Sequence, residues 1–405
     1  MTRSAQRIAI RRARPSDKKV VLGFCRRTWG EWGDYIDKVW DEWVKDKRGF
    51  FAVASLGERP IGTAKLTVLN KREMWFEGLR VDPSLRGMGI SHLLTAFLAR
   101  EALKRCAETV RYATGARNRA SLHIGKSWGL RRVGRYSILS ANSDGRRGEV
   151  FERMSDPTVI IGIMKNLSVP VNRIRMEPIG RETRFSRASL ESVLMGAARM
   201  ADKGSRGRRN ARLAEATDEI ARVVNSAPFT KAMFGLASEG WTFFRVDRDF
   251  LDDSFGKQEF FLGTLPKESA VRWQKNSVMR GPERGAGLLP GKTVAGWHLD
   301  SRTVSLLGIL IASPQRNRRR LLVKLVAEFR KDALGPLLSG TRRLAYELGL
   351  PRVRLIVPAT RAILACAGEA GFKEEDKGFY HVVMEMHLRD RRTRARVARL
   401  VAQYL

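Results

Sequence analysis

The segment from Val81 to Ser91 constrains the fold of this chain more than any other stretch. It reads VDPSLRGMGIS, so an apolar strand runs into a proline, then a basic turn with two glycines, then a helix. Apolar residues precede the turn in MWFEGLRV, and they recur at helical spacing from Ile90 to Leu98. The turn therefore connects a strand to a helix, as in a chain whose strands and helices alternate, and it predicts an α/β fold.

The same turn has the chemistry of a diphosphate site. The first turn of a helix presents free N–H groups at the positive end of the helix dipole. Because Gly87 and Gly89 lack a Cβ, a phosphate can approach the main chain there, and Arg86 adds positive charge. The spacing matches neither the Walker pattern nor the dinucleotide pattern GxGxxG. An ordinary glycine-rich loop is the alternative interpretation.

The spacing Arg86-x-x-Gly89-x-Ser91 resembles the acetyl-CoA-binding motif of the GNAT N-acyltransferase superfamily, usually written Q/R-x-x-G-x-G/A. Ser91 replaces the final small residue. The expected order of elements is similar to that family over about the first third of the chain, and it closes with an Asn118-led helix that stops at Gly129. The resemblance implies an α+β GNAT-type mixed sheet with flanking helices.

The resemblance also implies acetyl-CoA as the acyl donor and an amine that attacks it directly. The fourth strand, here around Leu79 to Val81, would pair with the pantetheine arm, and a main-chain N–H near Val81 would polarise the thioester carbonyl. The residues expected to bind the donor are Leu79, Arg80, Val81, Arg86, Gly87, Met88, Gly89, Ile90, Ser91 and Asn118.

Glu77 is the candidate general base. It is the only carboxylate expected inside the fourth strand, and strand alternation predicts that it shares a face with Leu79 and Val81. Families that resemble this chain commonly place the base on this strand. The alternatives are a surface glutamate paired with an arginine, or a carboxylate that holds the amine through bound water.

The general acid of the family is missing. Counting from Asn118, Gly125 stands where the family has a tyrosine. His123 lies about 200° around the helix from that position, whereas Ser121 lies on the same side, so Ser121 or water is expected to take the role. Because a thiol has a reference pKa of ~8.5, its thiolate is a tolerable leaving group without an acid.

The second half of the chain looks like a degenerate copy of the first. A strand at 303–312 precedes Ser-Pro and an expected helix at 313–329, which aligns Pro314 with Pro83 and leaves no phosphate cradle. A strand at 377–386 would close this copy. The sequence thus predicts a GNAT domain with the CoA site at 1–155, a linker at 156–170, a degenerate GNAT-like domain with insertions at 171–388, and a basic helix at 389–405.

Charge predicts a polyanionic partner. Lys plus Arg number 76 against 42 Asp plus Glu, a formal net charge of +34, with basic runs at 203–212, 314–320 and 389–399. Such attraction steers association with RNA, DNA or a ribonucleoprotein and weakens as salt rises. A general bias toward arginine is the alternative.

Other features narrow the class of protein. No run of eighteen apolar residues predicts a membrane span, and early arginines argue against a signal peptide. The three cysteines are scattered and the five histidines lack zinc-site spacing, so we expect a cytoplasmic protein without a bound metal. His381 and His387 are expected at a surface or edge. Four tryptophans at helical spacing indicate core packing, with an acceptor wall as the alternative: Trp29, Trp32, Trp40 and Trp43.

The leading hypothesis is an acetyl-CoA-dependent N-acetyltransferase that acts on an amine of a protein or nucleic-acid-associated acceptor. The alternative is a weakly catalytic or non-catalytic GNAT scaffold that binds RNA, DNA or the ribosome through its arginine-rich patches.

Overall fold

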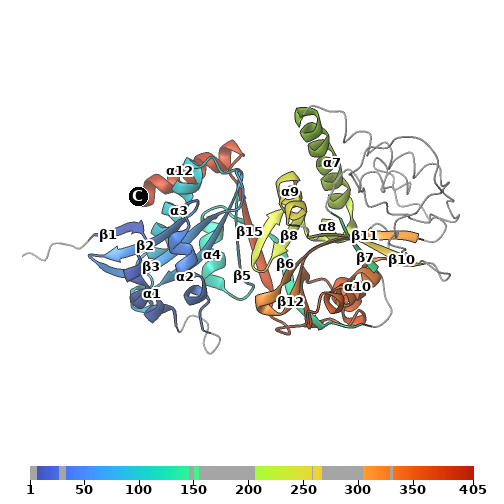
Figure 1. Cartoon of the computed structure of the whole chain (residues 1–405). Helices are drawn as coiled ribbons and strands as arrows, with labels where there is room; N and C mark the ends of the chain where they lie inside the picture. Colours follow the sequence, from blue (N-terminus) through green and yellow to red (C-terminus); the bar gives the residue numbers. More distant parts are fainter. Residues whose placement is uncertain are drawn as a thin grey trace, which may run out of the picture.

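The computed structural model describes residues 7–26, 33–145, 150–154, 206–257, 259–266, 304–328 and 332–405. These residues form two lobes that share one mixed sheet of 13 strands with helices on its faces (Figure 1). The predicted α/β class is confirmed. None of the helices in these ranges combines the length and apolar content that a bilayer span requires.

The first lobe is built from the N-terminal part of the chain. Its elements are β1 (Ile8–Arg12), α1 (Lys18–Cys25), α2 (Ile36–Lys45), β2 (Phe50–Leu56), β3 (Arg59–Val68), β4 (Glu73–Val81), α3 (Ile90–Lys104), β5 (Thr109–Gly115), α4 (Arg119–Ser127) and β6 (Arg131–Asn142). The side chains of β2 alternate between the two faces of the sheet. Phe51 and Val53 pack with α1 and α2 on one face, and Ala52 and Ala54 pack with α3 on the other.

The second lobe contains β7 (Val150–Met154), α7 (Arg206–Ser226), α8 (Pro228–Ala232), β8 (Leu236–Glu239), β9 (Thr242–Arg245), α9 (Arg248–Gly256), β10 (Phe260–Pro266), β11 (Val304–Gln315), β12 (Arg320–Glu328), α10 (Leu334–Glu347), β13 (Arg352–Pro358), α11 (Arg361–Glu369) and β14 (Lys373–Glu374). Its strand order β7-β10-β11-β12-β13 repeats β1-β2-β3-β4-β5, and each series ends in a parallel pair. This repetition supports the tandem hypothesis, which stays a prediction.

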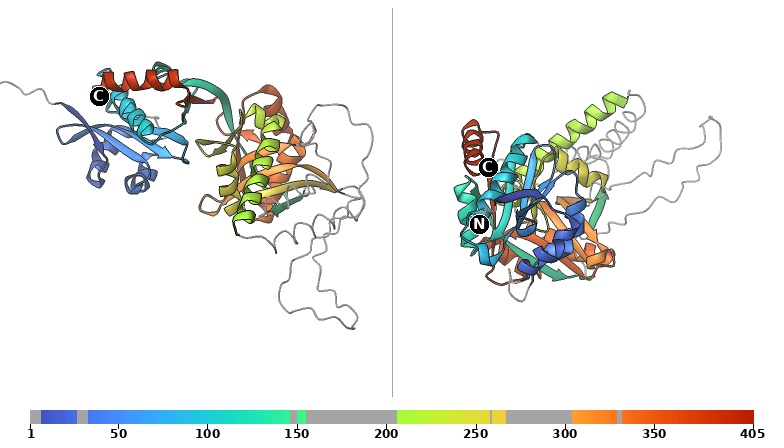
Figure 2. Two further views of the ribbon diagram at one scale, coloured as in Figure 1. Left: turned by 90° about the horizontal axis from the view of Figure 1, so that it is seen from above. Right: turned by 90° about the vertical axis from the view of Figure 1, so that its left-hand side faces the viewer.

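The two lobes exchange strands. β15 (His381–His387), expected to close the second copy, lies between β5 and β6 of the first lobe, while the second part of β6 pairs with β13. The chain then returns along the first lobe as α12 (Arg391–Tyr404), so both ends of the described chain lie there (Figure 2). The boundaries predicted at 155 and 171 therefore do not follow the sheet, and the predicted linker at 156–170 lies outside the described residues.

The prediction of a helix at 313–329 is wrong. Residues 304–315 and 320–328 form the antiparallel hairpin β11–β12, and the helix that follows is α10. The short apolar run LLVKLVAE fits a buried strand as well as a helix, and its sheet neighbours decide between the two. Pro314 is thus not the counterpart of Pro83. In the second lobe, β12 occupies the position that β4 has in the first lobe. Lys324 is four residues from the start of β12, the position that Glu77 has in β4.

Candidate functional site

The parallel strands β4 and β5 separate soon after they begin. They pair only between Glu73–Trp75 and Thr109–Arg111, whereas β3 accompanies β4 as far as Val81. From Phe76 onward, the edge of β4 that faces β5 therefore has no strand partner in the described part of the chain. An extended ligand arm can pair with such an edge as an additional strand.

A β-bulge interrupts β4 at this opening. Lys65 of β3 lies opposite Glu77, but Thr63 lies opposite Arg80, so the strand has one extra residue between these pairs. Gly78 lies in the bulge and has a φ of +63°, in the left-handed region. A Cβ at this position would lie 2.5 Å from the ring of Trp43. Only glycine combines this backbone with such close packing.

The bulge corrects two expectations about Glu77. Because the faces switch at the bulge, Glu77 shares a face with Lys65, while Leu79 and Val81 pack in the core with α3 on the opposite face. Glu77 is also not the only carboxylate in the strand, since β4 begins at Glu73. Glu77 thus faces the side of the sheet that α1 and α2 cover.

Glu77 has the surroundings of a proton acceptor. Its carboxylate accepts a hydrogen bond of 2.5 Å from Thr67 Oγ1, and Lys65 stands across the strand pair. Burial raises the pKa of Glu77 above that of an ordinary carboxyl group, and the Glu42 and Asp46 carboxylates add to this rise. A carboxylate with a raised pKa is a stronger base.

The glycine turn leads into α3, which covers the face of the sheet opposite α1 and α2. Asp82 begins it by accepting hydrogen bonds from the Ser84 N–H at 3.1 Å and hydroxyl at 2.8 Å. Gly87 and Gly89 have φ angles of +84° and +76°, and a Cβ on either would meet open space. α3 begins without a side-chain cap, so the N–H groups of 87–91 have no acceptor among the described residues. Such a start of a helix attracts an anion.

The other residues predicted at the donor site divide into three groups. Arg86 and Met88 are exposed, and no carboxylate of the described residues lies within ion-pairing distance of Arg86. The side chain of Ile90 is buried in the core, so this residue offers only its N–H group. Ser91 follows it in the first turn of α3, and its carbonyl accepts from Thr95.

Arg80 and Asn118 have other tasks. The Arg80 guanidinium is 2.6 Å from Asp34 on the α2 side, so only the main chain of Arg80 can serve a donor on the α3 side. Asn118 caps α4 by accepting from the N–H of Ser121 at 3.2 Å.

Tyr112 fills the space beside Gly125, a contact that no sequence pattern predicts. The Tyr112 hydroxyl donates to the carbonyl of Ser121 at 2.7 Å, and a Cβ on residue 125 would lie 2.2 Å from that hydroxyl. Burial raises the pKa of Tyr112 to about 12, so the phenol stays protonated at neutral pH. A tyrosine at 125 is therefore excluded by a tyrosine from β5.

Gly125→Ala is expected to destabilise the protein by about 1–3 kcal/mol, since the new methyl group overlaps the Tyr112 hydroxyl. Removing that hydroxyl with Tyr112→Phe should restore part of the loss in the double variant. Urea unfolding of both single variants and the double variant measures the coupling. Additive losses would show that the two residues do not compete for this space.

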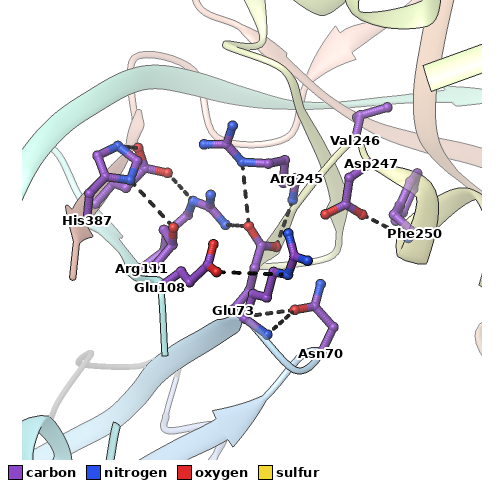
Figure 3. A network of polar contacts seen from close by, with 12 residues as sticks. Asn70, Glu73, Glu108, Arg111, Arg245, Val246, Asp247, Phe250 and His387 are labelled. Atoms are coloured by element: carbon purple, nitrogen blue, oxygen red, sulfur yellow. Dashed lines mark hydrogen bonds and ion pairs between the residues drawn. The ribbon is translucent and has the colours of Figure 1, made fainter. Parts of the chain in front are cut away.

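A polar network joins β4 and β5 to the second lobe, and sequence reasoning did not find it (Figure 3). Arg111 is fully buried and pairs with Glu73 at 2.8 Å and with Glu385 of β15. The main-chain N–H of Arg245 in β9 donates to Glu73 at 3.1 Å, and the Arg245 guanidinium lies 3.8 Å from the same carboxylate. The network lies at the last residue pairs of β4 and β5 before the two strands separate.

Comparison with known proteins agrees with this geometry. Residues 19–129 match the sequence model of the Acetyltransferase (GNAT) family. This part of the chain is a GNAT acetyltransferase domain, and acetyl transfer with acetyl-CoA as donor is the general chemistry of that family. A search of curated proteins found no match.

Several solved structures are similar at low identity. A putative acetyltransferase from Thermoplasma acidophilum is 15% identical, with 94% of this chain and 100% of that chain covered and a TM-score of 0.43. A GCN5-related N-acetyltransferase from Sphaerobacter thermophilus is 12% identical, with 94% and 96% covered and a TM-score of 0.46. The ribosomal-protein-S18-alanine N-acetyltransferase from Escherichia coli is 17% identical, with 32% and 81% covered and a TM-score of 0.29.

Proposed function

We propose that the first lobe transfers an acetyl group from acetyl-CoA to an amine. The observation that carries the proposal is the uncapped start of α3 beside the open edge of β4. The free N–H groups and Arg86 suit a diphosphate, and the edge at Leu79 to Val81 suits the pantetheine arm. When bound, acetyl-CoA supplies an activated thioester.

Glu77 would take the proton of the amine. It lies on the face opposite α3, so the acceptor and the donor approach the opening of β4 from opposite sides. Main-chain N–H groups near Val81 would stabilise the developing oxyanion. Ser121 is the predicted acid. Its main-chain carbonyl accepts a hydrogen bond from the Tyr112 hydroxyl, so its own hydroxyl, or water, would protonate the leaving thiolate.

Gly89→Val tests the donor site. A β-branched residue at a positive φ costs about 1–2 kcal/mol, and its side chain would enter the space where a phosphate meets the N–H groups. Calorimetry should show acetyl-CoA affinity reduced by about tenfold or more, which corresponds to about 1.4 kcal/mol. Gly349→Val is the matched control, because Gly349 also has a positive φ of 68° and open surroundings. Equal affinity in both variants would refute the site.

The acceptor is identified by incubating labelled acetyl-CoA with a cell extract and separating protein, RNA and small molecules. Label in any amine of these fractions that depends on Glu77 supports the proposal. Release of acetate alone, with no labelled amine, would contradict it.

A second candidate function, binding of an acidic macromolecule such as RNA, is favoured by α12. The helix packs on α3 through Val397, Leu400 and Val401, which leaves its arginines outward. The arginines of this helix are Arg391, Arg392, Arg394, Arg396 and Arg399. Among the described residues, no carboxylate lies within ion-pairing distance of any of them. Retention on immobilised RNA should fall steeply as salt rises.

A further inference from the structure

The basic run at 314–320 forms the end of β11, the turn after it and the first residue of β12. That first residue is Arg320. β12 pairs in parallel with β13, and the register places Arg320 opposite Arg352 and Leu322 opposite Arg354. Because residues in register share a face of the sheet, Arg320 and Arg354 are diagonal neighbours on one face.

The same two positions in the first lobe hold an ion pair. β4 and β5 pair in parallel with the same register, and Glu73 and Arg111 occupy the positions that Arg320 and Arg354 occupy in β12 and β13. Glu73 and Arg111 lie 2.8 Å apart as carboxylate and guanidinium. The second lobe has an arginine in place of the glutamate, so two like charges replace an attractive pair.

Both guanidinium groups keep N–H groups without acceptors. Arg320 donates through Nε to Gln315 at 2.9 Å, and Arg354 donates through Nη2 to Glu375 at 2.6 Å. The buried Nη2 of Arg320 and the buried Nε of Arg354 have no partner among the described residues. The Nη1 group of each makes no hydrogen bond within the described ranges and is accessible to solvent. Charged donors without acceptors are costly, so the pair requires an acceptor.

Positive charge exceeds negative charge around Arg320. Burial lowers its pKa to about 10, and the charges of Arg354 and Arg318 lower it further, while Glu375 acts in the opposite direction. In the part of the chain that the structure describes, no carboxylate lies within ion-pairing distance of Arg320 or Arg318. Two half-buried like charges destabilise this edge of the lobe unless an anion compensates them.

The charge of Arg354 also acts on His381 of β15. This histidine is 2% exposed, contrary to its expected surface position, and the ring of Trp241 in the turn between β8 and β9 meets it edge-on with centroids 3.9 Å apart. Burial lowers the pKa of His381 to about 4, and Arg354 adds to this shift. The imidazole is therefore neutral at neutral pH, and the excess of positive charge near Arg354 favours an anion as ligand.

A phosphate group has the charge and the acceptors that this pair lacks. A terminal phosphate carries about 1.5 to 2 negative charges at neutral pH and three acceptor oxygens. Guanidinium groups bind such oxygens through paired N–H groups. A carboxylate or a phosphodiester brings only one negative charge, so it would leave one of the two arginines uncompensated.

We propose that Arg320 and Arg354 bind a dianionic phosphate group, with Arg318 beside them, either as inorganic phosphate or as the terminal phosphate of an organic molecule. The phosphate would compensate in the second lobe the charge that the Glu73 carboxylate compensates in the first. This site gives the second lobe a ligand of its own and does not depend on acetyl transfer by the first.

Calorimetry with the full chain and inorganic phosphate tests the site. Arg320→Met should weaken phosphate binding by about 10- to 100-fold, the effect of losing hydrogen bonds to a charged group. Arg316→Met is the matched control, because Arg316 is an exposed arginine of the same turn, and its loss should leave the affinity nearly unchanged. The glycine turn and α12 also attract anions, so the difference between these two variants is the measure.

Arg320→Glu separates binding from a purely structural role. The new carboxylate would pair with Arg354 as Glu73 pairs with Arg111, so Tm without phosphate should rise above that of the unaltered chain. Phosphate should raise Tm of the unaltered chain but not of this variant, since a ligand stabilises only the protein that binds it. An equal rise with phosphate in both proteins would overturn the proposal.

Two further probes identify the source of the phosphate. Tighter binding of ribose 5-phosphate than of inorganic phosphate, lost in Arg320→Met, would assign the site to a phosphorylated organic molecule, and the reverse order would assign it to the free ion. An RNA oligomer without terminal phosphates supplies only phosphodiesters. Binding of that oligomer alone, weakened equally in Arg320→Met and Arg316→Met, would overturn the site in favour of general attraction to polyanions and leave the proposed acetyl transfer intact.

Discussion

Glu77→Gln is expected to slow acetyl transfer by about 10²- to 10⁴-fold, the usual contribution of a general base. The change keeps the size of the side chain and an oxygen that can accept from Thr67, but it removes the ability to take a proton. Since Glu77 faces away from α3, the affinity for acetyl-CoA should not change. Steady-state kinetics with an accepted amine and calorimetry with acetyl-CoA measure the two effects.

The pH profile gives a second test of Glu77. A base works only when it is unprotonated, so kcat/KM should fall as pH falls through the pKa of Glu77. Burial raises this pKa, and the acidic limb should therefore lie above the pH range of an ordinary carboxyl group. The limb should vanish in Glu77→Gln. Glu58→Gln, which changes an exposed carboxylate in the β2–β3 turn, is the control, and an equal loss of rate there would contradict the assignment.

Arg111→Met is expected to lower the free energy of unfolding by about 3–5 kcal/mol, the usual cost of breaking a buried ion pair. Arg111 is fully buried between Glu73 and Glu385, so its removal takes away the buried cation that these two carboxylates share (Figure 3). Urea unfolding measures the loss. Because Glu73 and Glu385 belong to β4 and β15, the variant should also loosen the strand that the C-terminal part of the chain contributes to the first lobe.

Two comparisons separate this effect from simple loss of an arginine. Arg343→Met removes a partly exposed pair with Glu347 and should cost only about 0.3–0.5 kcal/mol. The triple variant Glu73→Gln, Arg111→Met and Glu385→Gln carries no unpaired charge at this position and should recover most of the stability. A loss in Arg111→Met no larger than that of Arg343→Met would show that the network does not hold the sheet together.

Predictions from local patterns fared best where the pattern itself fixes the backbone. The turn from Val81 to Ser91 contains two residues with positive φ angles, and glycine adopts such angles at Gly87 and Gly89 without help from distant residues. The helix that follows begins without a side-chain cap. The apolar runs on either side are long enough to specify a strand and a helix. The core position of Trp40 and Trp43 follows from helical spacing in the same way, while Trp29 and Trp32 lie outside the described residues.

Predictions failed where the answer depends on a partner far away in the chain. The run LLVKLVAE is a strand because β11 and β13 lie beside it. Glu77 changes faces relative to Leu79 because a bulge against β3 adds one residue, and no local signal other than Gly78 marks it. Tyr112 of β5 leaves no room for a side chain at position 125 of α4, and neither segment reveals this alone.

The sequence by itself thus determined the α/β class, the backbone of the glycine turn and the family resemblance of residues 19–129, because these depend on periodicity and on glycines at fixed offsets. Only the tertiary structure decided that β15 returns to the first lobe, that β9 lies along its face, and that Arg245 and Trp241 stand beside Glu73 and His381. Strand pairing and face-to-face packing are set by the burial of surfaces distant in sequence, so one strand pattern is compatible with several neighbours until the whole sheet is assembled.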